Sequence, residues 1–228
     1  MPTPPNLLND DGSASMATMF MMSHHGLRRD LLRFERALGR EGRLDEAQVE
    51  ALRAEWQSYR ATLHGHHQVE DTGMFPRMRE VSPALAACID DLAEQHRQID
   101  PLLTRGDSAF AELPSPGPAL AVVRELRALL EPHLAQEEQH IVPVIRSAGA
   151  FPGPGTDAEA DLYAQGFAWS SHGIAPDILQ KVYALLPEVL TARLPAARAA
   201  FDERCRRAWG TARAGAARTP IPEADSYS

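Results

Sequence analysis

The chain has 228 residues, with 31 acidic and 23 basic side chains and a formal net charge of −8 at pH 7, and no block of Lys and Arg indicates a nucleic-acid partner. It has no apolar stretch long enough to span a bilayer and no secretion signal, and its two cysteines are too isolated for a disulfide framework. We therefore expect a cytoplasmic protein with no membrane partner and a sizeable core.

Helical periodicity runs through the chain and no strand-like alternation stands out, so we expect an all-α protein. Residues 1–14 are rich in Pro, Asn, Asp and Gly and read as a flexible N-terminal arm. A first helix is predicted from Ser15 to Leu38. A second is predicted after Asp45 and toward Met78, with glycines and a proline in its pattern that indicate a kink.

The third helix is predicted to begin at Ser82, which would cap a helix with proline at its first position, and to end near Arg105. A loop over 112–118 then precedes a fourth helix over 119–146. Four helices of this length can pack as one bundle.

The chain beyond this bundle is predicted to be a separate set of helices. Residues 148–157 are rich in Pro and Gly and are expected to form a linker. Residues 158–213 have helical periodicity punctuated by prolines, which predicts two or three accessory helices. The tail over 214–228 is expected to be disordered.

One metal-ligand pattern occurs twice, 67 residues apart. His66-x3-Glu70 is followed by Phe-Pro, and His133-x3-Glu137 is followed by Val-Pro, in matching positions. A His and a carboxylate four residues apart on a helix lie one turn apart on the same face, so both can reach one metal site. Two such helices facing each other would supply two imidazoles and two carboxylates, and each carboxylate could bridge a pair of metals.

A weaker repeat supplies one further His from each of the other two helices. The pattern His-x2-Leu-x3-Leu from His24 is matched by His-x2-Ile-x3-Leu from His96, at an offset of 72. Four histidines and two glutamates then make a complete inward-facing ligand set for a site in a bundle core.

Two further residues are candidates for completing this site. His67 is rotated off the face of its neighbour His66, yet a metal pair has more positions than six residues fill, so His67 is a possible ligand or orienting partner. Asp100, one turn after His96, is a possible additional oxygen donor.

Other polar side chains near the repeats have less direct roles. Asp71 and Glu138, which follow the two glutamates, are expected either to face solvent or to accept hydrogen bonds from ligand imidazoles. Three further histidines are expected at the surface: His64, His140 and His172.

The ordered set of histidines and glutamates resembles the hemerythrin-like HHE cation-binding domain over residues 15–147. The residues that carry the resemblance are His24, His66, Glu70, His96, His133 and Glu137. The resemblance implies an up-down four-helix bundle, followed here by additional C-terminal helices. It implies two non-haem iron ions with oxo- or hydroxo- and carboxylate bridges, in which the four histidines are terminal ligands and the two glutamates bridge. Oxygen-carrying members have two His at one-turn spacing on the third helix, whereas this chain has one.

The resemblance implies a protein that binds O2, NO or peroxide for sensing, carriage or scavenging. An alternative is a di-iron oxidase or peroxidase-type enzyme acting on peroxide or a small organic substrate, if the centre has an open coordination position and a substrate pocket. Zinc is the less favoured metal, because two carboxylates shared among four imidazoles suit a bridged pair better than one tetrahedral ion. A metal-free lattice of buried His–Glu hydrogen bonds is the remaining alternative. The pattern favours no particular oligomeric state.

Overall fold

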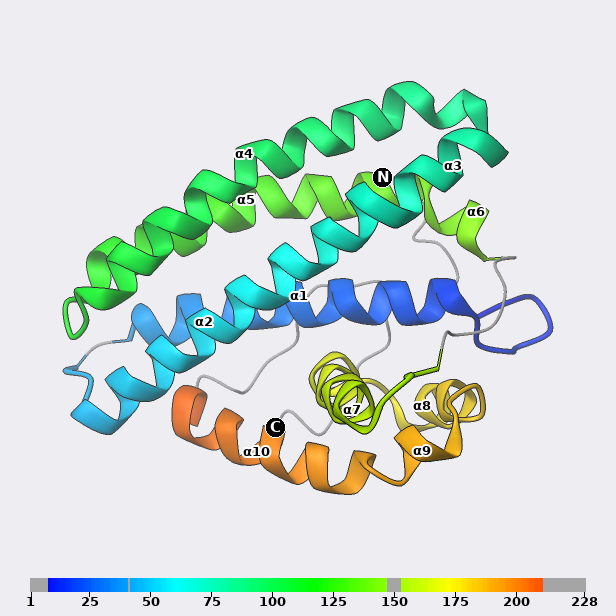
Figure 1. Ribbon diagram of the computed structural model, residues 1–228. Coiled ribbons are helices and arrows are strands. Elements are labelled where there is room, and N and C mark those ends of the chain that lie inside the picture. Colours follow the sequence, from blue (N-terminus) through cyan, green and yellow to red (C-terminus); the bar gives the residue numbers. More distant parts are fainter. Residues whose placement is uncertain (1–7, 41, 147–152, 211–228) are drawn as a thin grey trace.

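The computed structural model describes residues 8–40, 42–146 and 153–210, and no strand occurs in these ranges. Residues 1–7 of the expected arm, residues 148–152 of the expected linker and the expected tail lie outside them. The four long helices are α1 (Met16–Leu38), α2 (Glu46–Val69), α4 (Ala86–Ala111) and α5 (Pro116–His140). α5 packs against both α4 and α1, and α2 packs against α4 (Figure 1). The predicted all-α bundle is confirmed.

The second long helix changes its winding near the candidate ligands. After α2, one π-helical turn covers Glu70–Met74, and α3 (Phe75–Val81) continues in the same direction. The Phe75 N–H donates to the Glu70 carbonyl, five residues back, and Pro76 has no N–H to restore the α-helical spacing. The irregularity predicted in this helix is therefore a π turn, a feature that is frequent at functional sites.

α4 differs from its predicted bounds at both ends. A short 3-10 turn, Pro83–Leu85, precedes it, and among the described residues the Ser82 side chain makes no capping hydrogen bond. At its other end α4 continues through Pro101 to Ala111, beyond its expected end near Arg105. The loop before α5 is shorter than expected because α5 already begins at Pro116. The helix persists past the proline because the side chains that follow, including Leu102, Leu103 and Phe110, are buried in the core.

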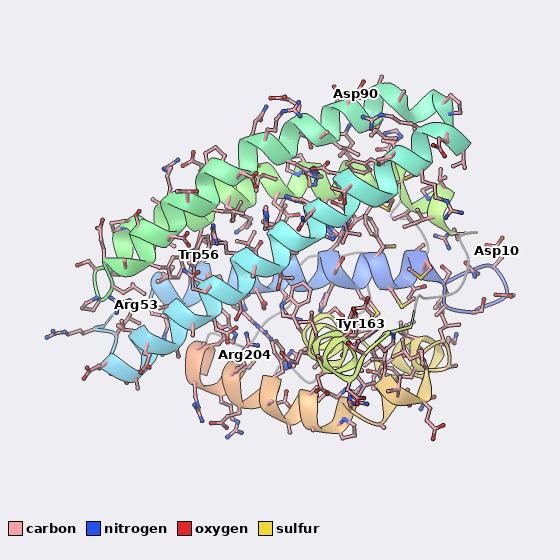
Figure 2. The ribbon with its side chains drawn as sticks, viewed as in Figure 1. Asp10, Arg53, Trp56, Asp90, Tyr163 and Arg204 are labelled. Carbon is pink, nitrogen blue, oxygen red and sulfur yellow. The ribbon has the colours of Figure 1, made fainter. Side chains whose placement is uncertain are left out.

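An aromatic cluster fills the core at the end of the bundle remote from the candidate ligands. The ring of Trp56 stacks on Phe110 with centroids 4.6 Å apart, and its Nε1 donates to Asp107 at 2.9 Å (Figure 2). Gly106 is required beside this ring, since a Cβ there would lie 1.9 Å from a Trp56 ring carbon. Trp209, from the last helix, packs on Phe34 with centroids 4.7 Å apart, so the C-terminal helices share this core.

Within residues 153–210, four helices follow the bundle, rather than the two or three expected. They are α7 (Asp157–Ser171), α8 (Pro176–Tyr183), α9 (Glu188–Thr191) and α10 (Leu194–Trp209). α7 packs against α1, and α10 packs against α7 and α2 (Figure 1). The Arg204 guanidinium on α10 forms an ion pair with Glu55 on α2, with Nε and Oε1 2.8 Å apart. α1 therefore has the bundle on one side and the C-terminal helices on the other.

Charged side chains of α1 are buried in its contact with α7. Asp30, 3% exposed, accepts hydrogen bonds from Arg29 Nε at 2.9 Å and from Trp169 Nε1 at 2.7 Å. Arg29 also donates to the carbonyl oxygens of Trp169 and His172. Burial alone would raise the pKa of Asp30, but the adjacent guanidinium groups of Arg29 and Arg33 outweigh it and hold the pKa below its usual value. The buried charges are thus paired across this contact, as buried ions must be.

Candidate metal centre

On α2, two neighbouring histidines lie on either side of one glutamate. Successive helical residues are rotated by about 100°, so Glu70 lies about 40° from His66 and about 60° from His67, between the two. One Glu70 carboxylate oxygen is 3.0 Å from His66 Nε2. The other is 3.6 Å from Nε2 of His96, which comes from α4. The Glu70 carboxylate therefore reaches imidazoles on two sides.

Glu137 on α5 has the same relation to its surroundings. Its two carboxylate oxygens lie 3.6 Å from His133 Nε2, on the same helix, and 3.3 Å from His24 Nε2 on α1. The His133 and His96 Nε2 atoms are 3.3 Å apart. Donor atoms from all four long helices therefore converge in the bundle core.

The converging donors form two adjacent groups in which all ligand atoms lie within 4.8 Å of one another. The first group is His67, Glu70, His96 and His133. The second group is His24, His66, Glu70 and Glu137. Glu70 belongs to both groups, and Glu137, which belongs to the second, also approaches His133 of the first. Two cation positions that share carboxylates fit this arrangement.

Many of these donor atoms have no hydrogen-bond partner within the part of the chain that the structure describes. They are Nε2 of His24 and His66, both ring nitrogens of His67, and all four carboxylate oxygens of Glu70 and Glu137. The short His66–Glu70 approach lacks hydrogen-bond geometry. Leaving a buried polar group unsatisfied costs about 1–3 kcal/mol, so such a concentration of unpaired atoms needs an explanation. Imidazole nitrogens and carboxylate oxygens are ligands for divalent transition metals, and the residues present fit a metal pair.

Burial shifts the pKa values of several of these groups in the metal-free protein. It raises the pKa of Glu70 well above its usual value, and burial together with the Glu70 charge raises the pKa of Glu137 to about 8. Burial also lowers the pKa of His66 to about 4 and lowers that of His67. The imidazoles of His66 and His67 are thus neutral and ready to coordinate, whereas the carboxyl groups of Glu70 and Glu137 hold protons that a cation would displace.

Three of the candidate ligand imidazoles are oriented by hydrogen bonds from the ring nitrogen remote from the site. His96 Nδ1 lies 3.0 Å from Asp71 Oδ1, and His133 Nδ1 lies 2.9 Å from Gln95 Oε1. Such partners fix the ring orientation and the tautomer of a metal ligand. Asp71 is exposed and also accepts from His96, so both of its expected roles apply.

The partner of His24 is itself held by a buried guanidinium group. His24 Nδ1 lies 3.0 Å from Glu138 Oε1, which accepts from Arg28 at 2.5 Å. Arg28 also bonds Glu131, whose side chain is partly exposed. Burial acts to raise the pKa of Glu138, but the hydrogen bond from His24 and the Arg28 charge outweigh it and lower the pKa. Glu138 therefore remains a charged acceptor beside the site.

Aromatic rings border both groups. The rings of His67 and His96 stack with centroids 3.9 Å apart, and Phe75 stacks on the His96 ring at 5.7 Å. On the other side, the ring of Phe20 lies 4.4 Å from the His24 ring and 5.5 Å from the His66 ring. The site is therefore lined by apolar rings as well as by donors.

The structure brings together all six residues of the two repeats, and it also places His67 among them. Asp100 is exposed and belongs to neither group among the described residues. His64 and His140 are exposed, as expected, but the expectation for His172 is wrong. Its ring is half-buried against α1 and lies 3.2 Å from an Arg33 guanidinium nitrogen, because α7 docks there. Phe20 and Gln95, which contact the ligand imidazoles, and Arg28, which holds Glu138, belong to neither repeat and carry no signal in the sequence pattern beyond the position of Phe20 and Arg28 one helical turn before and after His24.

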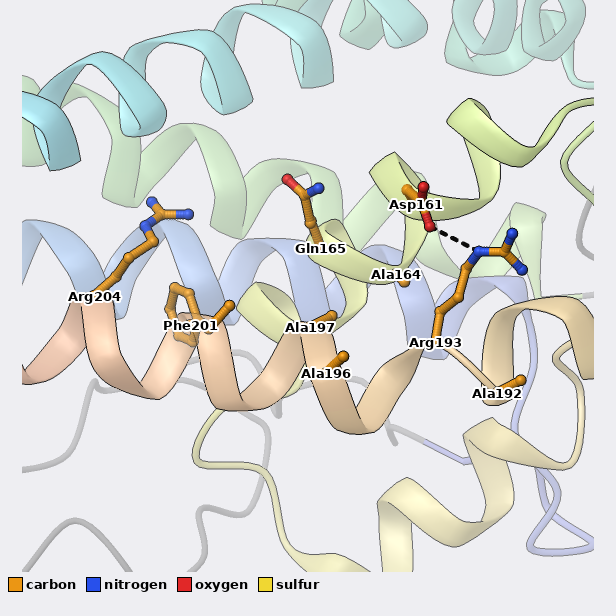
Figure 3. A pocket seen from close by; sticks show the side chains of 10 residues that line it. Asp161, Ala164, Gln165, Ala192, Arg193, Ala196, Ala197, Phe201 and Arg204 are labelled. Carbon is orange, nitrogen blue, oxygen red and sulfur yellow. Dashed lines mark hydrogen bonds and ion pairs between the residues drawn. The ribbon is translucent and has the colours of Figure 1, made fainter.

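A surface groove lies away from the candidate ligands. It has a volume of about 610 Å³ and lies among α7, α9 and α10 (Figure 3). Its charged side chains are already engaged: Arg193 Nε is 2.7 Å from Asp161, and Arg204 pairs with Glu55. This groove contains none of the converging donors, so it is not an entrance to them.

Comparison with known proteins identifies one relationship. A family model described as the hemerythrin HHE cation binding domain matches residues 15–154 of the chain. Searches of the curated proteins and of the solved structures found no match. None of the helices in the described residues is both long and apolar enough to cross a membrane.

Proposed function

Because the chain belongs to the hemerythrin HHE cation-binding domain family, we propose that its two groups of donors hold a pair of non-haem iron ions that binds O2, NO or peroxide. The observation that carries this proposal is the shared carboxylate: Glu70 lies within ligand reach of both groups. A protein that held one tetrahedral zinc ion would have no use for two overlapping groups. The protein would carry, sense or scavenge the bound gas or peroxide.

The donors divide unequally between the two ions. One ion would be held by His67, His96 and His133, and the other by His24 and His66, with Glu70 and Glu137 shared between them. A bound iron pair would supply two adjacent metals, each able to change its charge by one electron, to a small ligand.

The protein contributes orientation and the exclusion of water. Asp71, Gln95 and Glu138 hold three of the imidazoles in place, and the rings of Phe20 and Phe75 cover both sides of the site. A site that is apolar except for its donors strengthens every electrostatic interaction within it. Both cysteines are free, which suits the reducing cytoplasm that we propose as the compartment.

The first test is metal content together with an optical spectrum, on protein purified without oxygen and again after exposure to air. We expect close to two iron ions per chain and near-ultraviolet bands typical of a bridged ferric pair after oxidation. Spectral changes that reverse when O2 or NO is removed would support binding, whereas catalytic consumption of peroxide would support the enzyme alternative. One zinc ion per chain, or no metal, would overturn the proposal.

A further inference from the structure

The two proposed metal positions differ in how many protein donors surround them. The first has three imidazoles, from His67, His96 and His133, and the second has two, from His24 and His66. Since both share the same two carboxylates, the second position has one protein donor fewer. An external ligand would therefore have room beside His24 and His66. This step rests on the proposed function.

Phe20 lies beside both imidazoles of that second position. It precedes His24 by one helical turn, and its ring contacts the rings of His24 and His66. The rings of His24 and His66 themselves lie 5.3 Å apart, so the three rings form a compact triangle. α1 runs antiparallel to α2 and α5 in the bundle, so Phe20 lies toward the same end of the site as the residues after Glu70 and Glu137 (Figure 1). Phe20 thus borders the site at one end.

The aromatic contacts on the other side of the site are more deeply buried. Phe75 is 1% exposed and stacks on His96, whose opposite neighbour is the stacked ring of His67. Phe20, by contrast, is only partly buried. Among the phenylalanine rings that touch candidate ligands in the described residues, Phe20 is the one that reaches solvent. Movement of Phe75 would disturb a stack of three rings.

The surroundings of Phe20 permit it to move. Its side chain is purely apolar, and it packs at the meeting point of two hydrophobic clusters, one formed with the C-terminal helices and one around Phe75. No hydrogen bond fixes the ring, so only apolar contact and rotamer preference hold it in place.

We propose that Phe20 is the gate of the external-ligand position, and that its ring sets the size of ligand that reaches the metal beside His24 and His66. With the ring in place, small linear or diatomic ligands enter during brief rotations. Ligands the size of an imidazole ring are excluded.

The test compares native protein with Phe20→Ala, Phe20→Leu and Phe20→Trp. Met19→Ala is the matched control, because Met19 is the adjacent, partly buried residue of α1 and, among the described residues, packs against the hydrophobic cluster formed with the C-terminal helices but not against the one around Phe75. Stopped-flow absorbance would give the association rate of azide, and of free imidazole, with the oxidised iron-loaded protein. The rate of iron loss to a chelator would serve as a second readout of access.

We expect Phe20→Ala to raise the azide association rate about tenfold, a barrier lower by about 1.4 kcal/mol, and to admit imidazole. Phe20→Leu should lie between Ala and native, Phe20→Trp should be slower than native, and Met19→Ala should match native. Iron loss should follow the same order. If Phe20→Ala does not retain iron, the Leu and Trp variants, which keep a large apolar side chain, still test the gate. Azide must then associate faster than native with Phe20→Leu and slower than native with Phe20→Trp.

The outcomes separate the gate from the proposed function. If native protein binds iron and azide, but the Phe20 variants all react at the native rate, the gate is overturned and the iron pair stands. The gate is also overturned if Met19→Ala changes the rates as much as Phe20→Ala does. Native protein that binds no metal would overturn both.

Discussion

Side chains of neighbouring helical residues point in different directions. His66 and His67 therefore reach two different metal positions. Glu70 lies between their directions, so one stretch of α2 supplies a ligand to each of two positions and a carboxylate to both. His67 is 3% exposed, and both of its ring nitrogens are without hydrogen-bond partners within the described residues. A buried imidazole in this state is costly unless it binds a cation.

We therefore expect His67→Ala to remove about one of the two metal ions, since that position would keep only His96 and His133 as imidazole ligands. Metal analysis of purified protein measures this directly. His64→Ala is the matched control, because His64 is an exposed histidine three residues earlier on the same helix. Full metal content in His67→Ala would show that His67 is not a ligand.

The candidate site was more predictable at this scale than its surroundings. The two repeats identified six converging residues, because a four-residue spacing fixes which side chains share a helical face. The sequence does not decide whether His67 is a ligand, because that depends on the position of His96 on another helix. Asp100 follows His96 by one helical turn, as Glu70 follows His66, but it points to solvent. His172 is half-buried because α7 docks on α1, a contact that nothing in the local sequence around His172 reveals.

At the scale of elements, the close approach of α2 and α4 depends on one glycine. The Trp56 ring of α2 occupies the space that a side chain at Gly106 of α4 would need. Trp56 is fully buried and hydrogen-bonded to Asp107, so it cannot swing aside without breaking that bond. The sequence predicts the existence of the helices better than their bounds. α4 continues past Pro101 because tertiary packing outweighs the missing hydrogen bond, and the local sequence does not reveal such packing.

Gly106→Ala is therefore expected to destabilise the fold by about 3 kcal/mol, the upper end of overpacking costs in a filled core. Urea unfolding followed by circular dichroism would measure the change. Gly166→Ala is the control: this exposed glycine of α7 has no atom within 4 Å of an added Cβ, so alanine there should stabilise by up to about 1 kcal/mol. Equal effects of the two substitutions would contradict the packing argument.

At the scale of the whole molecule, the buried titratable groups make the stability of the metal-free protein depend on pH in two opposite ways. Burial lowers the pKa of His66 to about 4, and lowers those of His25 and His172 to about 3. Their stabilising contribution is complete above the unfolded value of 6.5 and is lost as the pH falls. The raised pKa of Glu137, about 8 against 4.5 unfolded, acts in reverse: its contribution is complete below 4.5 and is lost as the pH rises through 8.

Metal-free protein should consequently be most stable near pH 6.5 and should lose stability both as the pH falls below 6.5 and as it rises from there to about 8, where the contribution of Glu137 is fully lost. With metal bound, the carboxylates are ligands rather than buried charges, so the alkaline loss should disappear while the metal remains. Urea midpoints across a pH series, with and without metal, would measure both limbs. Glu137→Gln should reduce the alkaline loss in the metal-free protein, and an unchanged alkaline limb in that variant would contradict the assignment to Glu137.

Because α1 is buried on both sides, the region that matches the family is shorter than the unit that folds. The matched family region ends at residue 154, yet Asp30 and Arg29 find partners on α7, which begins at Asp157. Excising the matched region for expression would strip the cover from the same helix that carries His24. A truncated protein should therefore end after α10, because the stretch that matches the family is shorter than the stretch that the fold requires.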